Sequence, residues 1–135
     1  MAALSSWSKF KNSGLLLIRL GLGVMFIIHG YPKLMGGPEY WEGVGQAMRH
    51  VGIDFLPIFW GLLAAVAETL GGVFVFIGFF FRPAALLLAF TMLIATLHHL
   101  KSGDSLMTAS HAIEIGVVFL GLVFVGPGKY SVDKR

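Results

Sequence analysis

The sequence predicts an all-α integral membrane protein, an antiparallel bundle of four membrane-spanning helices. Two observations of composition support this prediction: 56% of the 135 residues are hydrophobic and only 13% are charged. Soluble domains contain about 45–50% apolar and about 25% charged residues. The third observation is that the apolar residues gather in four long stretches, each near the roughly 20 residues that cross about 30 Å of hydrocarbon. We therefore expect a single membrane domain over residues 1–135.

The four stretches predict helices over residues 14–34, 57–81, 83–100 and 106–126. No small-residue cleavage site follows the first stretch, so we interpret it as an uncleaved span rather than a signal peptide. The second and third stretches are separated only by Arg82-Pro83. Proline suits the first turn of a helix, so a tight turn between antiparallel neighbours is expected there.

The distribution of lysine and arginine predicts that both termini are cytoplasmic. In this orientation seven of the ten basic residues lie inside, and only Lys33, Arg49 and Lys101 lie outside. The net charge of +3 is scattered over the segment ends. We interpret it as a topology signal rather than as a nucleic-acid surface. The chain contains no cysteine, which excludes disulfides and cysteine-based metal sites.

The longest connection, residues 35–56, predicts a short amphipathic helix in the first outer loop. Gly52 is a plausible end for this helix. The alternative is an ordinary loop anchored by Tyr40 and Trp41. The helix prediction depends on four apolar residues that share one helical face: Trp41, Val44, Met48 and Val51.

Ionisable residues within the apolar stretches are the candidates for function, because each costs several kcal/mol in hydrocarbon unless it is partnered. Glu68 is the only ionisable residue of its stretch. At about 1.5 Å per residue it lies roughly 16 Å from Pro57, near the midplane. A carboxylate at that depth is protonated or paired. We expect a buried polar site in the outer half of the bundle, formed by His29, Glu68, His98, His111 and Glu114.

Structural interpretations of these groups stay open. His98 and His99 are adjacent and diverge by about 100°, so at most one is expected to point inward. Both could instead lie at the headgroup level. Arg19 and Lys33 could be cations that extend to the two interfaces. A purely structural pair of Glu68 with His29 or His111 is a further alternative.

Three kinds of chemistry suit such a site. Histidine and glutamate side chains can hydrogen-bond the carbonyls of a quinone and exchange protons with it. The same residues could bind a metal, since His111 and Glu114 resemble the Glu-x-x-His element of di-iron bundles in reverse order. Paired histidines could ligate a haem. We favour the quinone over the metal and the haem.

Five segments of the chain resemble the DoxX family of small four-helix membrane proteins. They are RLGLGVMFIIHGYPKL (Arg19–Leu34), AETLGGVFVFIGFFFRPAA (Ala67–Ala85), the histidine at 98 or 99, Glu114, and GPGKYSVD (Gly126–Asp133). The resemblance implies a bundle in the bacterial inner membrane that is linked with redox metabolism. Family members are similar to the DoxD subunit of thiosulfate:quinone oxidoreductase. Others are associated with an oxidative-stress complex that contains superoxide dismutase and a sulfurtransferase.

Carried over residue by residue, the resemblance marks Arg19, His29, Lys33, Glu68, Arg82, Glu114 and Asp133. The first functional hypothesis is a redox accessory subunit that handles a quinone beside other redox subunits or further copies of itself. The alternative is a small transporter or scaffold for a hydrophobic or weakly acidic molecule, without catalysis. Whether the chain is an enzyme stays open. At the inner end, Asp133 is expected to pair with Arg19 or Arg82 and to hold the C-terminal segment in place.

Overall fold

The computed structural model describes residues 3–133, and this part of the chain is almost entirely helical. Its elements are η1 (Ser5–Phe10), α1 (Lys11–Met35), α2 (Pro38–Gly45), η2 (Gln46–Val51), α3 (Pro57–Ile77), α4 (Phe81–Lys101) and α5 (Leu106–Val125). Four helices, α1, α3, α4 and α5, are long and apolar enough to cross a membrane. The prediction of an all-α protein with four spanning helices is confirmed.

Helices α1 and α3 pack with their backbones unusually close together, because glycines face one another between them. A Cβ atom on Gly23 would lie 2.8 Å from the Gly72 carbonyl oxygen. A Cβ atom on Gly30 would lie 2.7 Å from the backbone nitrogen of Thr69. Small residues permit such close contacts between membrane helices. This contact fixes which residues of α1 lie beside Glu68.

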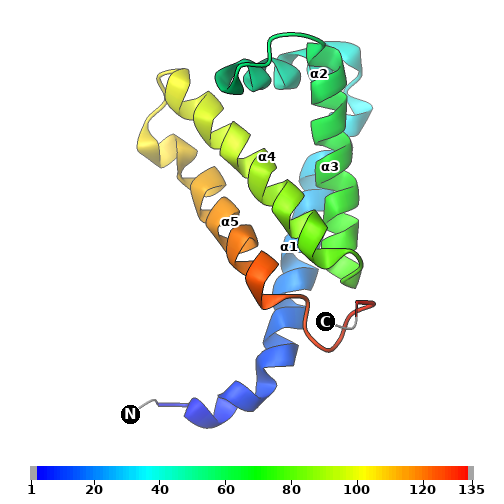
Figure 1. Cartoon of the computed structure of the whole chain (residues 1–135), viewed down its shortest axis with the longest axis vertical. Helices are drawn as coiled ribbons and strands as arrows, with labels where there is room; N and C mark the ends of the chain where they lie inside the picture. The colour runs from blue at the N-terminus through cyan, green and yellow to red at the C-terminus, as the bar shows by residue number, and fades with distance from the viewer. Residues whose placement is uncertain (1–2, 134–135) are drawn as a thin grey trace.

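Helices α3 and α4 meet at one end of the bundle and diverge toward the other (Figure 1). Gly78 ends α3 in the left-handed conformation, with φ of 73°. The turn therefore lies at Gly78–Phe80, and α4 already begins at Phe81. The expected turn at Arg82-Pro83 is wrong by a few residues, because Pro83 lies in the first turn of α4, where its missing N–H costs nothing.

The loop between α1 and α3 is helical, as α2 followed by η2, and Gly52 ends it with φ of 88°. This segment crosses the end of the molecule where α3 and α4 are apart (Figure 1). Its Gly45 contacts the backbone of Pro57, and Gly61 of α3 contacts the backbone of Trp41. Because these two glycines have no side chain, α2 can pack directly against the start of α3.

The hydrophobic core lies where α4 and α5 pack against the α1–α3 pair. Val75, Leu88 and Phe119 are fully buried in it. The rings of Phe26 and Phe119 meet edge to face, with centroids 5.1 Å apart. This aromatic contact joins α1 to α5, so the four long helices share one core.

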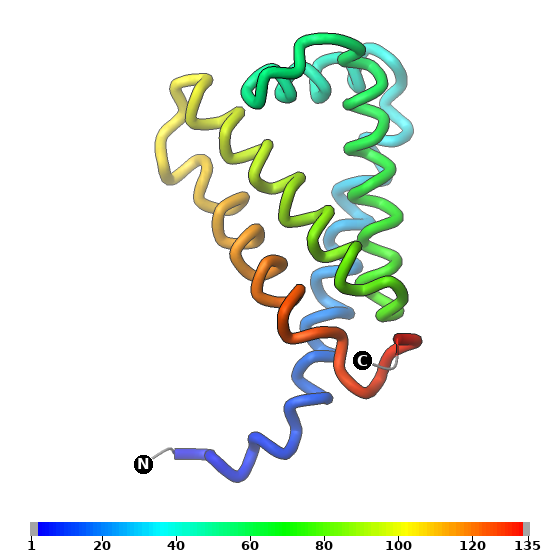
Figure 2. The backbone as a smooth tube through the Cα atoms, viewed as in Figure 1, coloured from blue at the N-terminus to red at the C-terminus, as the bar shows by residue number. Residues whose placement is uncertain are grey.

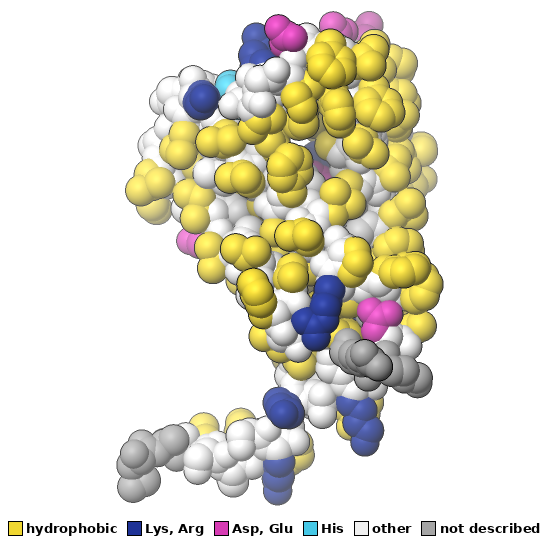
Figure 3. Space-filling view, viewed as in Figure 1, with side chains coloured by type: hydrophobic (Ala, Val, Ile, Leu, Met, Phe, Trp, Pro, Cys, Tyr) yellow, Lys and Arg dark blue, Asp and Glu magenta, His cyan; other side chains and the backbone are white. Residues whose placement is uncertain are grey.

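The outer surface suits a bilayer. Hydrophobic side chains cover the face shown in Figure 3, whereas most charged side chains lie near its two ends. The first and last described residues lie at the same end of the bundle (Figure 2). There, the Lys129 N–H donates to Asn12 Oδ1 over 3.0 Å. An even number of spans explains why the two ends of the chain meet.

Candidate ligand-binding site

A buried ion pair lies at the centre of the candidate site. Lys33 Nζ is 2.9 Å from Glu68 Oε1 and 3.0 Å from Oε2. The Glu68 side chain is only 5% exposed, and that of Lys33 is 29% exposed. The expectation that Glu68 is buried and paired agrees with this geometry. The alternative in which Glu68 pairs with His29 or His111 does not form, because Lys33 occupies that position.

The close contact between α1 and α3 explains the pairing. Gly30 rests on the backbone of Thr69, so the next turn of α1 lies over the preceding residue of α3. Lys33 is three residues after Gly30 and on the same helical face. Its side chain therefore reaches Glu68. A residue with a Cβ atom at position 30 would push the two helices apart and lengthen the ion pair.

The ion pair opens into a cavity of about 560 Å³ between α3 and α4. This volume lies within the usual range of about 300–1,000 Å³ for small-molecule sites. One wall is formed by α3 and the other by α4, and the α2–η2 segment forms the third side. The apolar or aromatic lining residues are Tyr40, Val44, Ala47, Met48, Trp60, Leu63, Ala64, Ala67, Leu87, Phe90, Ile94 and Ala95.

Few polar side chains line this cavity. Besides Lys33 and Glu68 they are Glu39, Thr91, His98 and His99. The hydroxyl of Thr91 already donates to the Leu87 carbonyl over 2.9 Å. The indole N–H of Trp60, which also lines the cavity, is buried and has no hydrogen-bond partner among residues 3–133. A buried donor without a partner is unusual and favours a polar acceptor nearby.

Histidines mark the end of the cavity where η2 approaches α4. The rings of His50 and His98 have centroids 5.6 Å apart. His99 Nδ1 lies 2.8 Å from Asp104 Oδ2. The pKa of His50 is lowered, first by its partial burial and then by the positive charges of His98, Lys101 and Arg49. The His50 ring is therefore neutral at neutral pH.

A second polar group lies on a different face of the bundle, between α1 and α5. His29, His111 and Glu114 are all exposed there. The rings of His29 and His111 are 6.4 Å apart. None of the three lines the cavity. The five predicted residues thus divide into two sets, with Glu68 and His98 at the cavity and the other three outside it.

Arg19 and Asp133 hold the C-terminal segment against the bundle at the end where the described chain ends lie. Arg19 is 2% exposed. It donates to the carbonyls of Val75 and Phe76 at 3.1 and 2.9 Å and to that of Tyr130 at 2.6 Å. Asp133 accepts from the backbone N–H groups of Phe80 and Phe81 at 3.1 and 2.8 Å. The expected ion pair of Asp133 with Arg19 or Arg82 does not form within residues 3–133.

Arg82 instead donates to the carbonyls of Val123 and Phe124 at the end of α5. A cation at the C-terminus of a helix satisfies its last carbonyls and its dipole. Three residues marked by the sequence therefore have structural partners at this end.

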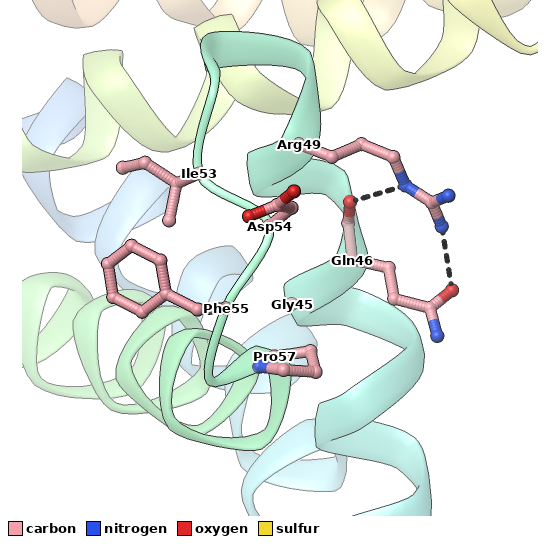
Figure 4. Close-up of a pocket in the computed structure, with 7 residues that line it drawn as sticks. All are labelled: Gly45, Gln46, Arg49, Ile53, Asp54, Phe55 and Pro57. Carbon is pink, nitrogen blue, oxygen red and sulfur yellow. Dashed lines mark hydrogen bonds between the residues drawn. The ribbon is translucent and has the colours of Figure 1, made fainter.

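Neither the second pocket nor any cluster of possible metal ligands among the described residues forms a better candidate site. A smaller pocket of about 230 Å³ lies in the loop after η2, where Arg49 is already hydrogen-bonded to Gln46 (Figure 4). Within residues 3–133, no three histidine, aspartate or glutamate side chains lie together in a way that could hold a metal ion. The cavity with the Lys33–Glu68 pair is the best-formed candidate.

Fold and site together define a class: a small multi-pass membrane protein with a buried ion pair beside a largely apolar cavity. The DoxX family model matches residues 14–100. The chain belongs to the DoxX family.

Curated relatives agree with this assignment. The inner membrane protein YphA of Escherichia coli is 32% identical over 90% of this chain and 89% of its own. The inner membrane protein YqjF of the same organism is 34% identical over 93% of this chain and 94% of its own. A Bacillus subtilis protein named "Putative oxidoreductase CatD" is 35% identical over 90% of this chain and 94% of its own. No solved structure matches the chain. The protein is a multi-pass protein of the bacterial inner membrane.

The sequence marks Lys33 but favours the membrane interface as its location rather than the cavity. The signal for the cavity is the helical face that Lys33 shares with Arg19 and Phe26. Trp60 carried no signal, since an aromatic residue near the end of a span is usually an interfacial anchor.

Proposed function

We propose that this protein is a redox accessory protein of the inner membrane that binds a quinone in the cavity between α3 and α4. The observation that carries the proposal is the Lys33–Glu68 pair beside an apolar cavity of about 560 Å³. A quinone combines a flat apolar ring with two carbonyl acceptors. The ammonium of Lys33 and the indole N–H of Trp60 are donors suited to those acceptors.

The ion pair also suits proton exchange. Reduction of a quinone to a quinol takes up two electrons and two protons. Lys33 and Glu68 can pass a proton between them and to a bound oxygen atom. The chain has no cysteine and no dinucleotide fingerprint, so the electrons come from a donor protein. The oxidoreductase name of the Bacillus subtilis relative is consistent with such a role.

Binding of decylubiquinone to the protein in lipid nanodiscs tests the proposal. The probe is the tryptophan fluorescence of Trp7, Trp41 and Trp60, of which Trp60 lines the cavity and is quenched by a bound quinone. Because a hydrogen bond to a charged group contributes about 1.5–3 kcal/mol, Lys33→Met should weaken binding about ten- to hundredfold. Lys101→Met is the matched control, since Lys101 is exposed near the same end of the bundle and does not line the cavity.

Thermal midpoints of both variants, measured without quinone, separate loss of binding from loss of fold. Extraction and mass spectrometry of lipids that copurify with the wild-type protein give a second readout. Absence of quinone from the extract, together with no saturable quenching, would contradict the proposal. Saturable binding of a hydrophobic acid in place of the quinone would favour the non-catalytic transporter or scaffold.

A further inference from the structure

The outward face of α5 carries an acidic residue where hydrocarbon is expected. Glu114 lies about 12 Å from one end of the helix and about 16 Å from the other, at about 1.5 Å per residue. It is exposed, and within residues 3–133 the structure gives it no hydrogen bond or ion pair. A lone carboxyl group facing lipid at mid-depth is costly, so this face needs a partner.

Glu114 belongs to a stripe that runs the full length of α5. The stripe follows steps of four and three residues, which is the spacing of the seam between two parallel, supercoiled helices. Every member is exposed. The residues are Met107, His111, Glu114, Val118, Gly121 and Val125.

Two members of the stripe explain how a second helix would fit. A Cβ atom on Gly121 would meet nothing within 4 Å, so this position is free to admit a neighbouring backbone. His111 precedes Glu114 by one helical turn and is also exposed. The stripe thus presents a basic and an acidic group side by side.

We propose that this stripe is the contact between two copies of the chain. Copies in one membrane share an orientation, so a two-fold axis along the membrane normal pairs α5 with α5 in parallel. Each interface of this kind is self-complementary. The symmetry sets Glu114 beside Glu114 of the other copy, with His111 of each copy one helical turn away. His111 of one copy then pairs with Glu114 of the other, twice, which satisfies both carboxyl groups. His29, whose ring is 6.4 Å from that of His111, borders the contact. This inference does not depend on quinone binding.

Disulfide trapping tests the contact directly, because the chain has no cysteine of its own. We expect Val118→Cys and Gly121→Cys to form linked dimers on mild oxidation in native membranes. Leu120→Cys is the matched control: it is exposed at the same depth of α5 but points away from the stripe. Equal cross-linking of the control, or none of either stripe variant, would overturn the proposal.

Energy transfer between labelled chains in liposomes measures the role of Glu114. Polar contacts between membrane helices contribute modestly, so Glu114→Ala should weaken self-association about three- to tenfold. Thermal midpoints in detergent confirm that the variant still folds. Two results count against the proposal: self-association that Glu114→Ala leaves unchanged, and a wild-type protein that stays monomeric at every protein-to-lipid ratio. Capture of a different membrane protein by this face, without dimers, also overturns it.

Discussion

The ammonium of Lys33 and the carboxylate of Glu68 depend on each other, because neither is fully solvated by water. Removing one partner of a buried ion pair leaves an uncompensated charge, whereas replacing both with apolar groups is often neutral. Lys33→Met should lower the free energy of unfolding by about 3 kcal/mol, the low end of the usual range because Lys33 is partly exposed. Adding Glu68→Leu should restore much of it.

Thermal or denaturant unfolding in detergent measures these changes, with Lys101→Met as the control that stays within about 0.5 kcal/mol of the wild type. A double variant that is as unstable as Lys33→Met alone would show that the two charges are not coupled.

Asp133 acts at the start of α4, where helix N–H groups have no partner within the helix. Its two oxygens accept from Phe80 and Phe81. Losing an N-terminal cap costs typically about 1 kcal/mol, so Asp133→Ala should lower the thermal midpoint. Asp133→Asn keeps one of the two acceptor oxygens, so it should lose less stability than Asp133→Ala. If the alanine variant melts together with the wild type, the C-terminal segment is not held by this contact.

The sequence indicated which polar residues matter more reliably than it indicated their partners. The burial of Glu68 follows from its lone position in an apolar stretch. The partners of Arg19 do not follow, because they are backbone carbonyls of Val75, Phe76 and Tyr130. Carbonyls occur at every residue, so a pairing with them leaves no mark in the sequence. The partners of Asp133 are backbone N–H groups, which leave no mark in the sequence for the same reason.

At the scale of whole elements, two glycines determine how α2 crosses α3. Gly45 contacts the backbone of Pro57, and Gly61 contacts that of Trp41. A backbone cannot yield as a flexible side chain can, so Gly45→Ala should shift α2 and destabilise the fold by about 1–3 kcal/mol. Gly43→Ala is the control on the same helix, because a Cβ atom there would meet nothing within 4 Å.

Alanine favours helix over glycine by up to about 1 kcal/mol, so the control should be neutral or slightly stabilising. Thermal unfolding in detergent compares the two variants. A Gly45→Ala protein that is as stable as Gly43→Ala would show that α2 can move away without loss.

The contact between η2 and α4 should respond to pH. His50 has a lowered pKa in the folded protein, so its cation is disfavoured there relative to a detached segment, where the pKa is about 6.5. The contact is therefore unaffected well above that value and is weakened as the pH falls below it. Hydrogen exchange of residues 46–51, corrected for intrinsic rates, should be faster at acidic than at neutral pH. His50→Gln should remove this difference, and an unchanged difference would exclude His50 as its cause.

At the scale of the whole molecule, hydropathy was sufficient for the four spans, but not for how they are spaced. Each span is recognisable by itself, whereas the cavity exists because α3 and α4 diverge and α2 crosses between their ends. The positions of α1 and α2 against α3 depend on the contacts of Gly30, Gly45 and Gly61, which are properties of pairs of helices. The sequence therefore predicts one polar centre, whereas the structure has two separate faces.

The orientation of the bundle is the remaining prediction for the whole molecule. The inner end should carry Lys9, Lys11, Arg82 and Lys129, and positive charge is retained on the cytoplasmic side. The described ends of the chain lie together (Figure 2), so both must be on one side of the membrane. A green fluorescent protein fused after Arg135 should fluoresce, and alkaline phosphatase at the same site should be inactive. Fusions after Gly103, in the loop between α4 and α5, should behave in the opposite way.

Active phosphatase at the C-terminus would invert the bundle and place the mouth of the cavity near η2 on the cytoplasmic side. A donor of electrons would then have to approach from that side.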